Sequence, residues 1–184
     1  MSVKEKLVEI TTQLIKEKNG NPELVTVREI AKRAEVGIGL INYHFQSKEN
    51  LISVCVKKII SSVIVGAKLV ENSSPSERLK EAVKLPVDFV MQNQEISRVS
   101  VIDDLTNGHP NDNSFETLEK YLFHVRNLRL NDDDYFRTVF LLHGIQGIFL
   151  RWELYKNQFD FSDKTTRDKM LDGLVERIFG GARE

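Results

Sequence analysis

The chain has 184 residues, a formal net charge of −1 and a single cysteine, and 41% of its residues are hydrophobic. A chain of this length can bury a substantial core in one or two domains. The lone Cys55 excludes an internal disulfide bond and a CxxC metal or redox motif. We find no signal peptide and no apolar run long enough to cross a membrane, so we expect a cytoplasmic protein.

The charges are divided unevenly between the two ends of the chain. Residues 1–60 contain ten Lys and Arg against seven Asp and Glu, or +3, whereas the remainder contains sixteen against twenty, or −4. This modest bias favours a nucleic-acid-binding N-terminal part on a neutral to acidic body.

The first predicted helix covers residues 2–18. Leu7, Ile10 and Leu14 recur there at the spacing of one helix face. The sequence Asn-Gly-Asn-Pro at 19–22 predicts a turn, because Gly and Asn suit a left-handed cap and Pro cannot continue a helix.

A short helix is predicted from Thr26 onwards. Thr26 followed by Glu29 is the pattern of a capping box, in which each side chain bonds to the other residue's backbone N–H. Ile30 and Ala34 then give this helix an apolar face.

A second short helix, Leu40 to Phe45, follows a predicted tight turn. We assign the turn to Gly37 and Gly39, since glycine tolerates the backbone angles that a sharp turn requires. Ser47 is then a suitable N-cap for a long helix that extends to about residue 70. Together these segments predict a helix-turn-helix.

Five more helices are predicted in the rest of the chain, at about residues 76–90, 95–105, 115–128, 133–157 and 163–180. No segment has the alternating pattern of a strand, and we find no internal repeat. The predicted fold is therefore all-α with about nine helices. We expect a DNA-binding domain at 1–47 and a ligand-binding and dimerisation domain at 48–184.

The N-terminal segments resemble a known family. The capped T-V-R-E-I-A helix, the V-G-I-G-L-I-N-Y-H-F helix and the S-K-E-N-L start of the next helix are similar to the DNA-binding head of the tetracycline-repressor-like (TetR) regulators. The resemblance covers about residues 7–55. It departs from the family pattern at Leu40, where threonine is frequent, and at Asn42, where tyrosine is frequent. It implies a homodimeric repressor whose affinity for its operator changes when a small molecule enters the body.

The outward side of the second short helix is the predicted contact with double-stranded DNA. Asn42 suits paired hydrogen bonds to adenine, and Leu40 or Ile38 suits a thymine methyl group. The side chains expected to reach phosphates are Thr26, Arg28, Tyr43, His44 and Lys48. The alternative interpretation is an ordinary helical hairpin with a polar outer face.

Two sites are predicted in the body, although plain core packing is the alternative for each residue. Gly144 and Gly147 would permit close approach of two helices, so we expect a dimer interface formed by Gly144, Gly147, Leu150, Leu154, Leu171, Leu174 and Ile178. The opposite side of the same segment is expected to line a ligand pocket, with Phe89, Leu122, Phe136, Phe140 and His143 as its residues.

Catalysis, cofactors and metal binding are not expected. We find no nucleophile–base motif and no phosphate-binding loop, and the four histidines lie far apart in the sequence. Cys55 is expected to be a buried apolar thiol. The sequence therefore predicts a homodimeric, ligand-responsive regulator that acts as a repressor and binds a palindromic operator. The alternatives are a ligand-independent DNA-binding adaptor of the same fold and a helical enzyme.

Overall fold

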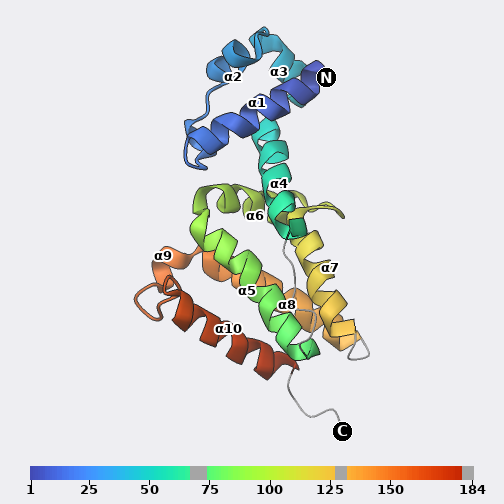
Figure 1. The fold of residues 1–184 in the computed structure, drawn as a ribbon, viewed down its shortest axis with the longest axis vertical. Coiled ribbons are helices and arrows are strands. Elements are labelled where there is room, and N and C mark those ends of the chain that lie inside the picture. Colours follow the sequence, from blue (N-terminus) through green and yellow to red (C-terminus); the bar gives the residue numbers. More distant parts are fainter. Residues whose placement is uncertain (67–73, 127–131, 180–184) are drawn as a thin grey trace. The chain divides into compact units, whose positions relative to one another are not determined.

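The computed structural model describes residues 1–66, 74–126 and 132–179, and every regular element in that part of the chain is helical (Figure 1). The prediction of an all-α fold is confirmed. The elements in chain order are α1 (Val3–Glu17), the 3₁₀ helix η1 (Pro22–Leu24), α2 (Val27–Ala34), α3 (Ile38–Phe45), α4 (Lys48–Gly66), α5 (Pro75–Gln92), α6 (Gln94–Asn107), α7 (Asn113–Arg126), α8 (Asp132–Leu150), α9 (Trp152–Tyr155) and α10 (Lys164–Phe179).

These helices form two compact units. The first contains Met1–Val65 and Asn93–Gly108, and the second contains Gly66–Gln92 and His109–Glu184. The predicted boundary after residue 47 differs from this division, because both α4 and the distant helix α6 belong to the first unit. Close packing explains the position of α6, since a Cβ atom on Gly20 would lie 3.3 Å from Ile96 of that helix.

The first unit has an apolar core built by α1 to α4. Its members recur every three or four residues, and the most deeply buried are Leu7, Leu14, Ile15, Ile30, Ile41, Leu51, Cys55 and Val56. Burying one such aliphatic side chain contributes roughly 1.5–3 kcal/mol. This core fixes which side of α3 is left to solvent.

Side-chain caps define where α1 and α2 begin. The Glu5 N–H donates to Ser2 Oγ (3.2 Å) and the Ser2 N–H donates to Glu5 Oε2 (2.7 Å), which is a full capping box that our sequence analysis missed. At α2 the Glu29 N–H donates to Thr26 Oγ1 at 3.2 Å, as predicted. The Glu29 carboxylate, however, pairs with Lys18 (3.1 Å), so the Thr26 cap is only half of the predicted box.

The turn between α2 and α3 does not depend on glycine in the predicted way. Its left-handed residue is Glu35, with φ 55° and ψ 42°. The Val36 N–H donates to Ala31 O (3.0 Å) and closes the end of α2. Gly37 has ordinary extended angles as the N-cap of α3, and Gly39 lies inside that helix. The assignment of the turn to the two glycines was therefore wrong.

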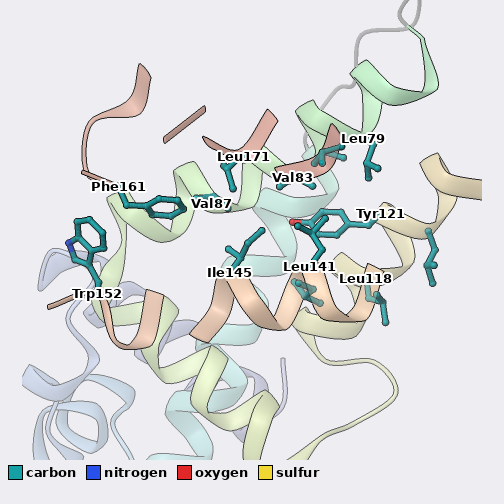
Figure 2. Packing of buried hydrophobic residues seen from close by; sticks show 14 residues of the cluster. Leu79, Val83, Val87, Leu118, Tyr121, Leu141, Ile145, Trp152, Phe161 and Leu171 are labelled. Carbon is teal, nitrogen blue, oxygen red and sulfur yellow. The ribbon is translucent and has the colours of Figure 1, made fainter. Parts of the chain in front are cut away.

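The second unit is organised around a separate apolar core (Figure 2). Helices α5, α7, α8 and α10 contribute most of it, including Leu79, Val83, Val87, Leu118, Tyr121, Leu122, Leu141, Ile145, Leu171 and Val175. Trp152 and Phe161 extend the cluster, with ring centroids 5.9 Å apart. Burial of Tyr121 raises the pKa of its hydroxyl, because the phenolate form loses its hydration.

The helix predicted over 133–157 is broken in two. Helix α8 ends at Leu150, and Arg151 has non-helical angles (φ −112°, ψ 19°) before the short α9. Trp152 is buried directly after this break. The change of direction thus brings a large aromatic side chain into the core.

Candidate nucleic-acid interface

Helices α2 and α3 pack through a few small and apolar side chains. Helix α2 buries Ile30, Ala31 and Ala34, and α3 buries Ile41 and Phe45. The two alanines are short, so they permit the second helix to lie close. Because Ile41 and Phe45 are four residues apart, they occupy one face of α3, and the residues from Ile38 to Tyr43 other than Ile41 are left to solvent.

The solvent side of α3 carries four of the predicted DNA contacts. Tyr43 is 79% exposed, Ile38 is 45% exposed and Leu40 is 37% exposed. Asn42 is also exposed. The helix therefore presents apolar and uncharged polar groups outwards, as the sequence predicted.

His44 lies at the side of α3 and not at its outer face. Its ring is half-buried, with centroids 5.0 Å from the ring of Tyr43 and 6.3 Å from the ring of Phe45. Both contacts are edge-on. These contacts restrict the orientations in which His44 could reach a phosphate.

The starts of α2 and α4 lie near each other. The half-buried Lys48 donates from Nζ to Val25 O at 3.3 Å, immediately before the exposed Thr26 and Arg28. Ser47 caps α4 by accepting from the Asn50 N–H (3.1 Å), as predicted. Free N–H groups and positive charge at helix starts suit phosphate oxygen atoms.

Several cations of this unit are already matched by carboxylates. Lys6 pairs with Glu35, Lys18 with Glu29, and Arg33 with Glu17. Lys4 is placed differently, with its Nζ 5.7 Å from the centroid of the Phe45 ring at the end of α3. Lys4 is thus a further candidate phosphate contact, which the sequence did not reveal because no local pattern brings residues so far apart together.

Comparison with known proteins identifies this arrangement. A sequence profile described as bacterial regulatory proteins, tetR family, matches residues 12–55, from α1 to the first turns of α4. Solved TetR regulators share the fold of the whole chain. A TetR transcriptional regulator from Rhodococcus sp. RHA1 has a TM-score of 0.66 at 15% identity, covering 97% of this chain and 98% of that one. The head thus matches the tetR family profile, and the chain has the fold of solved TetR regulators.

Other TetR structures agree. The regulator SCO7222, a TetR from Streptomyces coelicolor, has a TM-score of 0.62 at 15% identity, with 97% of this chain and 88% of that chain covered. A transcriptional regulator from Rhodococcus sp. Rha1 is 20% identical, with a TM-score of 0.56 and coverage of 100% and 99%. At these identities the structures show a shared fold. No curated protein sequence matches the chain.

The profile match and the shared fold confirm three predictions: the resemblance itself, the helical fold with its helix-turn-helix head, and a regulator in place of an enzyme. The protein is a DNA-binding transcriptional regulator, and α2 and α3 are its helix-turn-helix.

The predicted dimer residues differ in their exposure to solvent. Gly144 is exposed, and a Cβ atom on Gly144 or Gly147 would meet nothing within 4 Å. Leu154 is also exposed. Leu171, by contrast, is 2% exposed and lies in the core of its own chain, so its prediction as a dimer contact was wrong. The remaining three, Leu150, Leu174 and Ile178, are half-buried.

The residues predicted to line a ligand pocket differ in their exposure to solvent. Phe136 and Phe140 are 67% and 65% exposed, and their rings stack at 6.5 Å. His143 is exposed, with its Nδ1 2.8 Å from Gln146 Oε1. Leu122 is fully buried in the core. Phe89 is half-buried. The exposure of Phe136, Phe140 and His143 leaves their assignment to a pocket a prediction.

The predicted opposition between pocket and dimer faces of α8 is also incorrect. Phe136, Phe140, Gly144 and Gly147 follow one another at steps of four, four and three residues. Such steps keep to one face of a helix with 3.6 residues per turn. The exposed Phe136, Phe140 and Gly144 thus share one face of the helix with the half-buried Gly147, and we call this face the α8 face.

Three further observations concern metal sites, membrane spans and the cysteine in the described part of the chain. Within residues 1–66, 74–126 and 132–179, no three His, Cys, Asp or Glu side chains come together as a metal site. None of the helices described here is long and apolar enough to span a bilayer. Cys55 is buried, its Sγ contacts Val8 O at 3.5 Å, and burial raises the pKa of its thiol to about 11. This agrees with an inert, structural thiol.

Proposed function

We propose that the protein is a homodimeric transcriptional repressor that binds a palindromic operator through α3 and responds to a small molecule bound in its second unit. The observation that carries this proposal is the solvent-exposed face of α3, which the buried contacts with α2 hold in place. Because bacterial operators lie on the chromosome, we expect the protein to act in the cytoplasm.

Each exposed group has a role in this proposal. Ile38, Leu40 and Asn42 contact base edges in the major groove, because the N-terminal residues of a recognition helix reach the bases. The phosphate contacts are Thr26, Arg28, Tyr43, His44 and Lys48, and we add Lys4 to this set. Phosphate contacts fix the position of the head on the duplex, and base contacts select the sequence.

The α8 face supports a dimer. Phe136 and Phe140 expose two large stacked rings to solvent, and Gly144 and Gly147 leave open space beside the same line. A second α8 related by a two-fold axis could cover the rings and approach closely over the glycines. Two heads on one dimer would contact two half-sites, which is why a palindrome is expected.

His124 supports a ligand site in the second unit. Its side chain is 2% exposed, and its Nδ1 has no hydrogen-bond partner in the part of the chain that the structure describes. Burial lowers the pKa of this imidazole, and the charge of Arg78 lowers it further. An unpaired buried nitrogen is costly, so a ligand that hydrogen-bonds to His124 gains from relieving it. We therefore propose a polar contact at His124 in place of His143.

Three backbone connections join the second unit to the first. The chain passes between the units after Val65, after Gln92 and after Gly108. Both α4 and α6 therefore move with the head whenever the first unit moves. We propose that ligand binding changes operator affinity through these two helices, with coupling that must be equal in both directions.

A titration distinguishes a ligand-responsive repressor from a ligand-independent adaptor of the same fold. A thermal-shift screen identifies a small molecule that stabilises the protein. Its affinity is then measured by calorimetry with and without operator DNA. Weaker ligand binding in the presence of operator supports the repressor, and equal affinity favours the adaptor. His124→Gln should weaken binding of that molecule, and His109→Gln, at an exposed histidine of the same unit, is the matched control.

A further inference from the structure

The recognition helix lacks the side chains that usually read G·C pairs. Residues Ile38 to Phe45 include no Arg, Lys, Asp or Glu. In the major groove, guanine is read mainly by Arg or Lys, and cytosine by Glu or Asp. Adenine is read by Asn or Gln, and the methyl group of thymine by apolar side chains. The composition of α3 therefore matches the A·T half of this code.

The exposed aliphatic side chains are at the end of α3 that reaches the bases. Ile38 and Leu40 lie in its first turn and keep 45% and 37% of their surface in solvent. Gly37 and Gly39 alternate with them, and the space that a Cβ atom would take at either glycine is open. Nothing at the two glycines shields the aliphatic groups from a base edge. Asn42, one turn further along, is also exposed.

Water is a poor environment for these aliphatic groups, and the major groove offers one apolar counterpart. The only methyl group on a base edge is that at C5 of thymine. Covering an aliphatic side chain with this methyl removes apolar area from water on both sides. The cations Arg28 and Lys48, at the neighbouring helix starts, suit the phosphate backbone next to such a contact.

We propose that α3 reads an A·T-rich half-site, with Ile38 and Leu40 packed on thymine C5-methyl groups and Asn42 hydrogen-bonded to an adenine. This inference rests on the proposed function, because it assigns a base preference to the same DNA-binding face. It places the discriminating groups in the first five residues of the helix, and it gives Tyr43 and His44 no part in choosing the base.

The test begins with selection of bound duplexes from a random-sequence pool by the full-length protein. In the enriched site, each dT is then replaced singly by dU, which removes the C5-methyl and leaves base pairing intact. Burying one methyl-sized group corresponds to about a fourfold change in affinity. We expect such a loss at one or more positions in each half-site.

Substitutions in α3 link the methyl groups to their partners. Leu40→Ala and Ile38→Ala should each weaken binding, and each should cancel the dU effect at the position that its side chain contacts. Val54→Ala is the matched control, since Val54 is a 44% exposed aliphatic residue on α4 of the same unit. It should leave both the affinity and the dU effects unchanged.

The outcomes separate this inference from the proposed function. A·T-rich half-sites with dU effects that Leu40→Ala or Ile38→Ala cancels support it. Specific binding to a site whose contacted positions are G·C, or dU effects that neither substitution changes, overturns it and leaves the repressor proposal intact. If no sequence is enriched, sequence-specific DNA binding by this face is contradicted, and the inference fails with it.

Discussion

Arg167 of α10 donates a hydrogen bond to Asp88 of α5, and its guanidinium also donates to Phe161 O at 3.0 Å. Arg167 is 3% exposed. Burial raises the pKa of Asp88, but hydrogen bonds from Lys164 and Arg167 outweigh this effect and hold the pKa below its usual value. The pair therefore joins the two helices through a nearly buried charge.

Asp88→Asn should destabilise the second unit, because it leaves the charge of Arg167 without its carboxylate. Removing one partner of a fully buried ion pair costs about 3–5 kcal/mol, and an exposed pair contributes about 1 kcal/mol or less. Since the Asp88 side chain is 21% exposed, we expect roughly 2–3 kcal/mol, between these limits. Urea denaturation monitored by circular dichroism measures this loss.

The control for Asp88→Asn is Glu153→Ala, which removes the exposed ion pair with Lys156. It should change the free energy of unfolding by about 0.5 kcal/mol or less. A loss for Asp88→Asn no larger than that of the control would show that the pair does not hold α10 in place.

The same pair predicts a dependence of stability on acid pH. Because the pKa of Asp88 is lower in the folded state, its stabilisation is complete above the ordinary Asp pKa of about 3.9 and is lost as the pH falls through the folded pKa. The wild-type protein should therefore lose more stability than Asp88→Asn on acidification below about pH 4. Equal losses would contradict the assignment.

His124 predicts a second pH dependence, at higher pH. Its pKa is lowered in the folded state, so the unfolded chain binds more protons as the pH falls through about 6.5. Stability is then unaffected well above this value and decreases below it. Thermal melts across this range should show a smaller decrease for His124→Gln than for wild type or His109→Gln. A steeper decrease in His124→Gln would reverse the sign and refute the prediction.

The head was predictable from sequence because its signals are local. Thr26 and Ser47 mark helix starts within three residues of their partners, and the pair Ile41 and Phe45 defines the packed face of α3. The left-handed turn residue was not predictable, since Glu35 adopts that conformation in the presence of a nearby Gly37.

The body was harder to predict because apolar character does not reveal which surface covers a residue. Phe136 and Phe140 have the composition of core or pocket residues, yet they are exposed on α8. Leu171, which we had assigned to a subunit contact, is buried in its own chain. The packing of Ile96 near Gly20 is a long-range contact with no pattern in the sequence. Such features depend on tertiary structure.

Phe140→Glu should convert the protein to a monomer. A carboxylate on the α8 face would be buried without a partner in a two-fold contact, which is strongly unfavourable. Sedimentation analysis at micromolar concentration measures the change, and Leu85→Glu, at a 39% exposed leucine of α5, is the control. Gly147→Leu, a bulky substitution on the same face, is a second test. If both Phe140→Glu and Gly147→Leu remain dimeric, the α8 face is excluded as the interface.

Cys55 should resist modification in the folded protein. Its thiol is buried and its pKa is raised to about 11, so little thiolate is available near neutral pH. Iodoacetamide labelling followed by mass spectrometry should be slow in buffer and fast in denaturant. Rapid labelling of the native protein would indicate an exposed, reactive thiol.

DNA recognition by α3 is tested most directly by comparing the operator selected from random sequence with a scrambled duplex of equal length, in anisotropy titrations at several salt concentrations. We predict that wild type prefers the operator by about a thousandfold or more, and that Asn42→Ala reduces this preference.

Arg28→Ala should weaken binding to both duplexes and reduce the salt slope by about 1, whereas Lys16→Ala, at an exposed cation near the end of α1, should not. Equal affinity of wild type for the two duplexes, or an operator preference that survives Asn42→Ala, Leu40→Ala and Ile38→Ala unchanged, would contradict the assignment of α3 as the reading surface.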